Sequence, residues 1–372
     1  MASPLPDPIP LHLVRRALVT KLRHHGDVLL TSPVFTTLKR AAPGIEIDAL
    51  VYEETAPMLT GHPAIAEVHT IDRNWKKRGV PTQLREEWSL LRRLRAREYD
   101  LLVHLTEHPR GLTLARLLHP RWAVTRERDR RSALWRRHFT HFYRLPARTE
   151  RHVVEQNLDA LRRIGVHPDE ADRRLVLVPG AEAERRVAQL LAEHGLTPKD
   201  FVQVHPGSRW LFKCWPAERT AALVGLIVAD GHAVVLTGAP DDRERALVAA
   251  VLAATRPATR ARVVDLTGAL SMRELAALTG CARAFAGVDS APMHIAAAMR
   301  TPTLALFGPS SEIAWGPWRV PQRVVVSTAF PCRPCGLDGC GGGKVSECLT
   351  TLPVERVHGA LAALVDETRD RT

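Results

Sequence analysis

The residues from His205 to Lys213 contain a Gly-Ser turn followed by a lone cation, a combination that suits an anion. The apolar run Phe201–His205 leads into Gly207 and Ser208. Glycine lets backbone N–H groups approach a ligand closely, and lysine supplies a compact positive charge. We therefore predict half of a phosphate-binding site here, with Ser208 and Lys213 as its side chains.

A second segment, Gly287–His294, runs from an apolar stretch into an Ala-rich one, which indicates a strand followed by a helix. The unpaired N–H groups and partial positive charge of a helix N-terminus form a seat for an anion. Residues 290–293 occupy that position, and Pro292 is tolerated there because a first-turn N–H has no partner in the helix. A capped helix without any ligand needs the same Asp-Ser-x-Pro pattern, so both interpretations stay open.

A third segment places Gly26 and Asp27 shortly after an apolar run that ends at Lys21. Gly26 frees the backbone, and a carboxylate in a loop at a strand end is suited to act as a general base. The alternative is that Asp27 caps the helix that follows.

These segments need strands and helices to hold them, and the apolar pattern supplies both. Apolar runs of strand length alternate with helical patterns, which is typical of parallel sheets in α/β proteins. The predicted strands are residues 16–21, 46–51, 101–105, 201–205, 233–238, 284–288 and 303–307. The predicted helices are residues 32–41, 84–97, 153–164, 217–229, 243–254 and 272–281. We expect two Rossmann-like halves, 1–178 and 179–372, with ligands bound at strand ends and in the cleft between the halves.

The length of 372 residues exceeds the size of a single hydrophobic core, in agreement with two domains. Residues 1–180 hold 31 Lys and Arg against 21 Asp and Glu, so they carry most of the net charge of +12. Clusters such as Trp75–Arg78 and Arg92–Arg97 indicate a face that meets a polyanion: nucleic acid, an anionic membrane or a phosphorylated acceptor. Solvated helix faces in an Arg-rich chain are the alternative.

No uncharged apolar run reaches the roughly 18 residues that a membrane helix needs. The first ten residues have neither the basic nor the apolar region of a secretory signal. We therefore expect the chain to remain in the cytoplasm. The pI near 10.0 also leaves open a second class, the nucleic-acid-binding proteins.

Together and in this order, the three segments resemble a known family. Lys21–Val34, His205–Trp215 and Gly287–Ala298 are similar to segments of the ADP-heptose:lipopolysaccharide heptosyltransferases, glycosyltransferase family 9, and the middle one is closest to the heptosyltransferase III branch. The resemblance spans about residues 15–350. Three motifs at domain-scale spacing are far more specific than one glycine-rich motif.

The resemblance implies a GT-B fold with an acceptor domain, 1–178, and a nucleotide-sugar domain, 179–372, whose last helix is a candidate to pack back on the acceptor domain. It implies inverting transfer of heptose from ADP-L-glycero-D-manno-heptose to the inner core of lipopolysaccharide. By position, Asp27 matches the family's catalytic aspartate, and Lys213 matches the lysine at the donor phosphates. The family's diphosphate-binding turn falls on Asp289, Ser290, Ala291, Met293 and His294.

These roles make chemical sense, because an inverting transfer needs a base for the acceptor hydroxyl and hydrogen-bond donors for the departing diphosphate. We expect no cofactor and no metal at the site, since no Asp-x-Asp pair lies near these segments. The family's acceptor sits on lipid A at the inner face of the inner membrane, so we expect peripheral membrane association and no nucleic-acid partner. Lys21 and Arg23 are the candidate acceptor contacts. Another nucleotide sugar or core position remains an alternative.

Four cysteines, Cys332, Cys335, Cys340 and Cys348, lie in a Gly-rich loop. Four thiolates can bind zinc, but a zinc ribbon has two Cys-x₂-Cys pairs and this loop has one. A cytoplasmic location argues against disulfides. Similar loops recur in parts of the family, so we expect a structural loop and leave a zinc site open.

Overall fold

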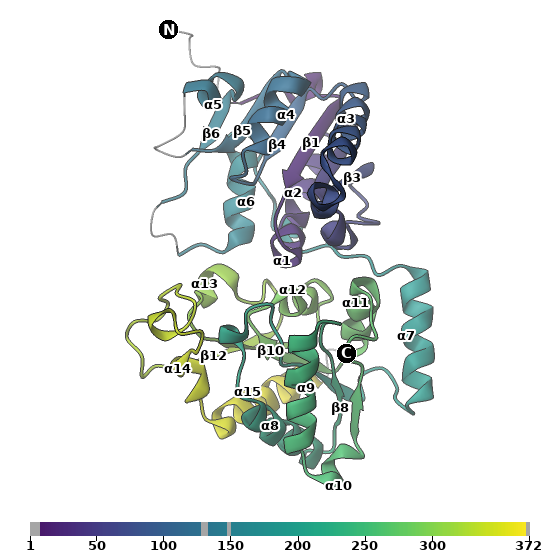
Figure 1. Cartoon of the computed structure of the whole chain (residues 1–372), viewed down its shortest axis with the longest axis vertical. Coiled ribbons are helices and arrows are strands. Elements are labelled where there is room, and N and C mark those ends of the chain that lie inside the picture. The colour runs from purple at the N-terminus through teal and green to yellow at the C-terminus, as the bar shows by residue number, and fades with distance from the viewer. Residues whose placement is uncertain (1–7, 128–132, 147–149, 370–372) are drawn as a thin grey trace. The chain divides into compact units, whose positions relative to one another are not determined.

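The computed structural model describes residues 8–127, 133–146 and 150–369 and divides into two compact units, Met1–Val178 and Pro179–Thr372 (Figure 1). The start of the chain, on which the absence of a secretory signal was judged, lies largely outside the described residues. Within the described ranges, no helix combines the length and the apolar character that crossing a membrane requires.

The first unit contains a six-stranded sheet in the order β3-β2-β1-β4-β5-β6, and all neighbouring strands are parallel. Its strands are β1 (Arg16–Lys21), β2 (Glu46–Tyr52), β3 (Glu67–Ile71), β4 (Leu101–His104), β5 (Trp122–Arg126) and β6 (His141–Tyr143). The chain moves outward from β1 to β3 and returns to β4 on the other side of β1. The strand order therefore reverses between β1 and β4, where open α/β sheets bind ligands at their carboxyl edge.

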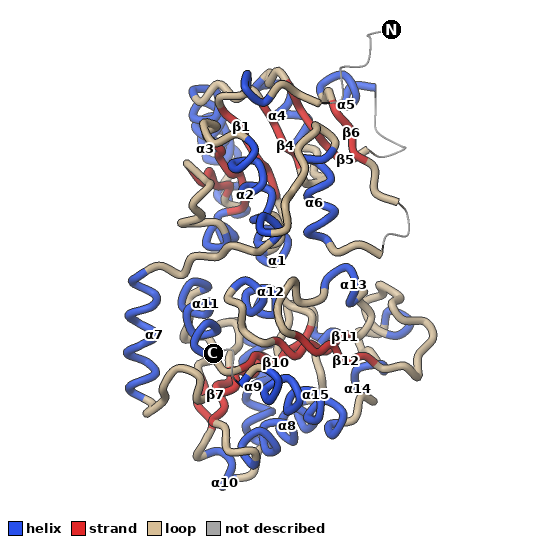
Figure 2. Tube along the Cα trace, turned by 180° about the vertical axis from the view of Figure 1, so that it is seen from behind, coloured by secondary structure: helices blue, strands red, loops and turns tan. Residues whose placement is uncertain are grey.

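The helices of the first unit lie on both faces of this sheet (Figures 1 and 2). They are α1 (His25–Leu29), α2 (Ser32–Ala41), α3 (Val80–Ala96), α4 (Arg110–Leu118), α5 (Ala133–His138) and α6 (Val153–Arg162), with the 3₁₀ turns η1 (Leu11–Leu13), η2 (Glu53–Met58), η3 (Arg73–Arg78) and η4 (Ala171–Arg173). Helix α2 packs with α6, whereas α4 packs with both α3 and α5. Leu18, Leu50 and Leu102 of the strands form one core cluster with Leu94 of α3 and Leu114 of α4.

The second unit repeats this topology with a six-stranded parallel sheet in the order β12-β11-β10-β7-β8-β9. Its strands are β7 (Phe201–His205), β8 (Ala233–Leu236), β9 (Val263–Asp265), β10 (Ala284–Val288), β11 (Thr303–Phe307) and β12 (Gln322–Val326). Here the strand order reverses between β7 and β10. Gly287 pairs with His205, so the two strands end at the same edge of the sheet.

Helices cover both faces of the second sheet as well. They are α7 (Ala181–Glu193), α8 (Ala217–Ala229), α9 (Asp242–Ala254), α10 (Pro257–Arg260), α11 (Met272–Cys281), α12 (Ala291–Ala298), α13 (Glu312–Trp315), α14 (Glu347–Thr350) and α15 (Val354–Glu367), with η5 (Leu211–Lys213) and η6 (Cys340–Gly342). Val224 of α8, Val248 of α9 and Leu361 of α15 belong to one core cluster, and Val187 of α7 and Leu278 of α11 belong to another. Helix α15 packs on α8, β11 and β12 of its own unit.

The predicted strands and helices are confirmed, with end shifts of a few residues. The sequence analysis missed five strands, β3, β5, β6, β9 and β12. Three of these strands give a weak signal in the sequence. Strands β6 and β9 have only three residues each, and the residues of β9 are partly or fully exposed. Strand β12 lies at a sheet edge and has one buried position. The acceptor and donor roles of the two halves stay predictions.

Candidate functional site

In the first unit, the loop that follows β1 contains the predicted residues Lys21, Arg23 and Asp27. Asp27 lies in the first turn of the five-residue helix α1, and its side chain is 16% exposed. The Arg23 side chain is well exposed, and its Nε lies 3.8 Å from Oδ1 of Asp27. Arg23 and Asp27 therefore lie together at the carboxyl edge of the sheet, where a carboxylate can receive a proton from a bound hydroxyl. The N-cap of α1 is His24, so Asp27 does not cap that helix.

Lys21 lies beneath this loop and is buried. Its ammonium group donates to the backbone oxygen of Leu105 at 3.2 Å and to Oδ1 of Asn157 at 3.1 Å. Burial lowers the pKa of Lys21 to about 8, and the negative charge of Asp27 partly opposes that shift. Lys21 therefore joins the ends of β1 and β4 to α6 from inside the unit, and direct contact with an acceptor stays a prediction.

Asn157 and the pair Glu107–Arg126 are polar residues near this loop that the sequence analysis missed. Asn157 also donates to the backbone oxygen of Leu30, so one amide links α6 to both Lys21 and the end of α1. Arg126 donates to Glu107 at 3.0 Å in the loop after β4. Because Asn157 and Lys21 are 136 residues apart, no local pattern could have joined them.

In the second unit, an ion pair joins the two predicted anion-binding segments. Nζ of Lys213 donates to Oδ2 of Asp289 at 2.6 Å, and the side chains are 22% and 8% exposed. Ser208, which is buried, donates from Oγ to the backbone oxygen of Asp289 at 3.5 Å. The lysine follows β7 and the aspartate follows β10, so the tertiary structure brings the two segments together at the point of strand reversal.

Helix α12 begins directly after this ion pair, with Ser290 as its N-cap. Ser290 donates its hydroxyl to the backbone oxygen of Val288 at 3.2 Å, and among the described residues no side chain caps the helix. The first-turn N–H groups at Ala291 and Met293 therefore have no side-chain cap in the described structure, which is the arrangement that suits an anion. This observation disfavours the interpretation of a self-capped helix.

Met293 and His294 are buried, and their side chains pack inside the unit. Met293 packs in a core cluster with Phe285 and Phe307. The His294 ring lies against Trp315 of α13, with 6.4 Å between ring centroids. These side chains hold the turn from below, and their contact with a donor stays a prediction.

A buried pair, His205 and Glu244, supports Gly207 and was missed by the sequence analysis. Nε2 of His205 lies 3.4 Å from Oε2 of Glu244, and its Nδ1 lies 3.0 Å from Oγ1 of Thr237. Burial raises the pKa of Glu244, but the hydrogen bond and charge of His205 outweigh it and hold the pKa below its usual value. A Cβ on Gly207 would lie 2.4 Å from Oε2 of Glu244, so the absence of a side chain permits this packing.

The cysteines are all free thiols. Burial raises the pKa of Cys214 to about 12, so this neighbour of Lys213 stays a protonated packing residue. Cys332, Cys335 and Cys340 are exposed, and Cys348 is buried. Their loop is anchored beside η5, because Ser346 donates to the backbone oxygen of Phe212 at 2.5 Å.

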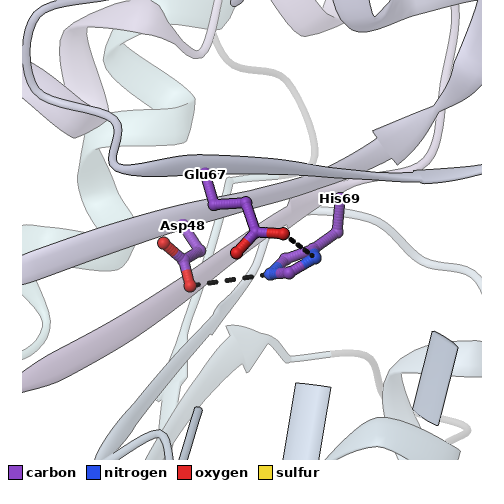
Figure 3. A group of neighbouring side chains, drawn as sticks. All are labelled: Asp48, Glu67 and His69. Carbon is purple, nitrogen blue, oxygen red and sulfur yellow. Dashed lines mark ion pairs between the residues drawn. The ribbon is translucent and has the colours of Figure 1, made fainter. Parts of the chain in front are cut away.

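A different group, Asp48, Glu67 and His69, places carboxylate and imidazole atoms within 4.8 Å of one another (Figure 3). Asp48 is fully buried and accepts hydrogen bonds from Arg97 and Tyr99, each at 2.7 Å. Burial raises its pKa, but hydrogen bonds from His69, Arg97 and Tyr99 outweigh this and lower the pKa to about 2. Because the guanidinium of Arg97 already neutralises Asp48, we interpret this group as a structural network and not as a metal site.

Comparison with known proteins identifies the family of the chain. The model of glycosyltransferase family 9 (heptosyltransferase) matches residues 87–345. Lipopolysaccharide heptosyltransferase 3 from Escherichia coli is 37% identical over 80% of this chain and 84% of its own length.

Solved structures share the fold. A glycosyl transferase of family 9 from Veillonella parvula superposes with a TM-score of 0.82 at 25% identity, covering 97% of this chain and all of its own. E. coli heptosyltransferase WaaC, solved with ADP-2-deoxy-2-fluoro heptose, gives a TM-score of 0.68 at 20% identity, covering 95% of this chain and 99% of its own. The expected GT-B fold class is thereby confirmed.

Replacing Gly207 by alanine tests the packing over Glu244. We expect Gly207→Ala to lower the free energy of unfolding by about 1–3 kcal/mol, because the new Cβ displaces the Glu244 carboxylate. Gly225→Ala is the control, since nothing lies within 4 Å of its Cβ on helix α8. Urea unfolding measures both variants, and equal stability of the two would contradict the packing argument.

The buried Lys21 predicts a specific dependence of stability on pH. Its pKa is about 8 when folded and near 10.5 when unfolded, so the unfolded chain binds more protons between these values and stability rises with pH there. Relative to Lys21→Met, the parent should gain roughly 2 kcal/mol of unfolding free energy between about pH 7.5 and pH 10. Urea unfolding at both pH values measures the difference; a constant gap would show that Lys21 titrates normally.

Proposed function

The chain belongs to glycosyltransferase family 9, the heptosyltransferases, and from this premise we propose that it transfers heptose from ADP-L-glycero-D-manno-heptose to the inner core of lipopolysaccharide, with inversion at the anomeric carbon. The observation that carries the proposal is the ion pair Lys213–Asp289 beside the N-terminus of α12. This arrangement brings a lysine close to backbone N–H groups that no side chain caps in the described structure, and such a group of donors can bind a diphosphate.

The donor half of the reaction depends on charge that grows on the leaving diphosphate. Lys213 and the N–H groups of Ala291 and Met293 can donate to its oxygens, and each such donor is worth about 10²–10³-fold in rate by analogy with oxyanion holes. Asp289 holds the lysine by a short charge-assisted hydrogen bond. Oγ of Ser208 lies 3.5 Å from the backbone oxygen of Asp289, which keeps the two loops in contact beside the ion pair.

The acceptor half requires a base. Asp27 takes the proton from the attacking hydroxyl as that oxygen bonds to the anomeric carbon and the bond to the diphosphate breaks. Arg23 lies 3.8 Å from the Asp27 carboxylate, and the negative charge of Asp27 also acts on the buried Lys21. An acceptor carried on lipid A also implies that the enzyme works at the inner face of the inner membrane as a peripheral protein.

Asp27→Asn separates chemistry from donor binding. We expect kcat to fall by about 10²–10⁴-fold, because the amide cannot accept the proton, while the Kd for ADP-heptose changes little. Transfer to heptose-deficient lipopolysaccharide and calorimetric titration measure the two quantities. Glu182→Gln, on the exposed start of α7, is the control for loss of one carboxylate. Retained turnover in Asp27→Asn would exclude Asp27 as the base.

A double-mutant cycle tests the donor site. Lys213→Ala should weaken ADP binding about 10–100-fold, because it removes a charged donor and leaves the Asp289 carboxylate facing the diphosphate. Adding Asp289→Asn should restore part of the affinity, so the two effects are not additive. Lys77→Ala, an exposed lysine of the other unit, should leave ADP binding unchanged. ADP binding by Lys213→Ala at parental strength would contradict the proposed donor site.

A further inference from the structure

Helix α3 exposes an apolar ridge on its outer face. Val80, Leu84 and Trp88 are spaced four residues apart, so they stack on successive turns of the helix. Their exposed fractions are 68%, 65% and 60%, and they are among the most exposed large hydrophobic residues of the described chain. Single exposed apolar residues are common, but three in a row on one helix face mark a surface that contacts something.

The ridge is not needed to hold α3 in the fold. A neighbouring face of the helix supplies Leu90 and Leu94 to the core of the first unit, where Trp75 of η3 also packs. Figures 1 and 2 both show α3 along one side of this unit. The helix is therefore attached through one apolar face and presents a second one outward.

Cations flank the ridge on the same helix. Arg85, Arg92 and Arg93 are exposed, and Arg92 and Arg93 have no ion-pair partner among the described residues. Arg85 contacts the neighbouring Glu86 at 2.8 Å. From residue 75 to residue 97 the sequence contains eight Lys or Arg and two Glu, so this side of the unit is strongly basic.

We propose that the outer face of α3, defined by Val80, Leu84, Trp88, Arg85, Arg92 and Arg93, docks on the surface of an anionic phospholipid bilayer. Leucine and tryptophan insert at the boundary of headgroups and acyl chains, while the arginines pair with lipid phosphates. A nucleic-acid partner would use the cations and could stack on Trp88, but it would leave Val80 and Leu84 in water. The inference deepens the proposed function, on which it rests for the identity of the membrane.

The test is sedimentation of the purified full-length protein with vesicles. The parent should bind vesicles of equal parts phosphatidylcholine and phosphatidylglycerol, bind pure phosphatidylcholine weakly, and be released by high salt. Leu84→Gln/Trp88→Gln and Arg92→Gln/Arg93→Gln should each reduce the partition coefficient by about tenfold or more, since each cation near an anionic surface contributes about 1 kcal/mol.

Matched controls separate the α3 face from general properties of the protein. Leu13→Gln removes another exposed leucine of the first unit, and Arg256→Gln/Arg260→Gln makes the same change in net charge at the N-cap and the last residue of α10. Both should bind vesicles like the parent. If the parent does not bind, if the controls lose as much as the α3 variants, or if the apolar variant binds normally, the proposal is wrong.

A transfer assay on a soluble, de-acylated core acceptor distinguishes this inference from the proposed function. All α3 variants should keep parental kcat on that acceptor, because their side chains face the bilayer and not the reacting groups. Transfer without vesicle binding would overturn the docking surface and leave the enzyme assignment intact. Vesicle binding without transfer would support the docking surface and overturn the enzyme assignment. Binding only to vesicles that contain lipopolysaccharide would show that the α3 face binds the acceptor and not the phospholipid.

Discussion

The pairing of β7 with β10 fixes where the loops that carry Lys213 and Asp289 lie in the second unit. The two strands lie side by side and end at the same edge, so the loops after them must meet. Lys213 and Asp289 make that meeting specific, because a short hydrogen bond between opposite charges fixes the lysine in front of α12. The first unit applies the same topology, and the loops after β1 and β4 meet at Lys21.

Buried charges support both edges. Lys21 is held by neutral oxygens from β4 and α6, and its lowered pKa records the cost of removing an ammonium group from water. His205 and Glu244 lie under Gly207 and are satisfied by each other and by neighbouring groups. Breaking such a pair leaves an uncompensated charge, so each unit resists local rearrangement of its strand-end loops.

Much of the architecture follows from patterns in the sequence. The strand at 284–288 is recognisable because it is apolar throughout, and α11 is recognisable because its helical period begins at Ser271, whose capping box with Glu274 fixes the start. The edge strands β9 and β12 were missed because their apolar runs, Val263–Val264 and Val324–Val326, are shorter than the runs that mark buried parallel strands. Helix α3 was predicted too short because Val80 lies on a solvent-facing turn outside the buried pattern.

The sequence by itself determined the two α/β halves, because apolar periodicity is a local property. It also determined that Asp27, Lys213 and Ser290 lie in segments that follow strands, because turn residues mark where strands end. Only the tertiary structure decided which groups meet: Lys213 with Asp289, and Lys21 with Asn157. It also decided that Lys21 is buried and that Val80, Leu84 and Trp88 face water. Contacts between residues far apart in the chain depend on how strands order and helices pack, and no local pattern records that order.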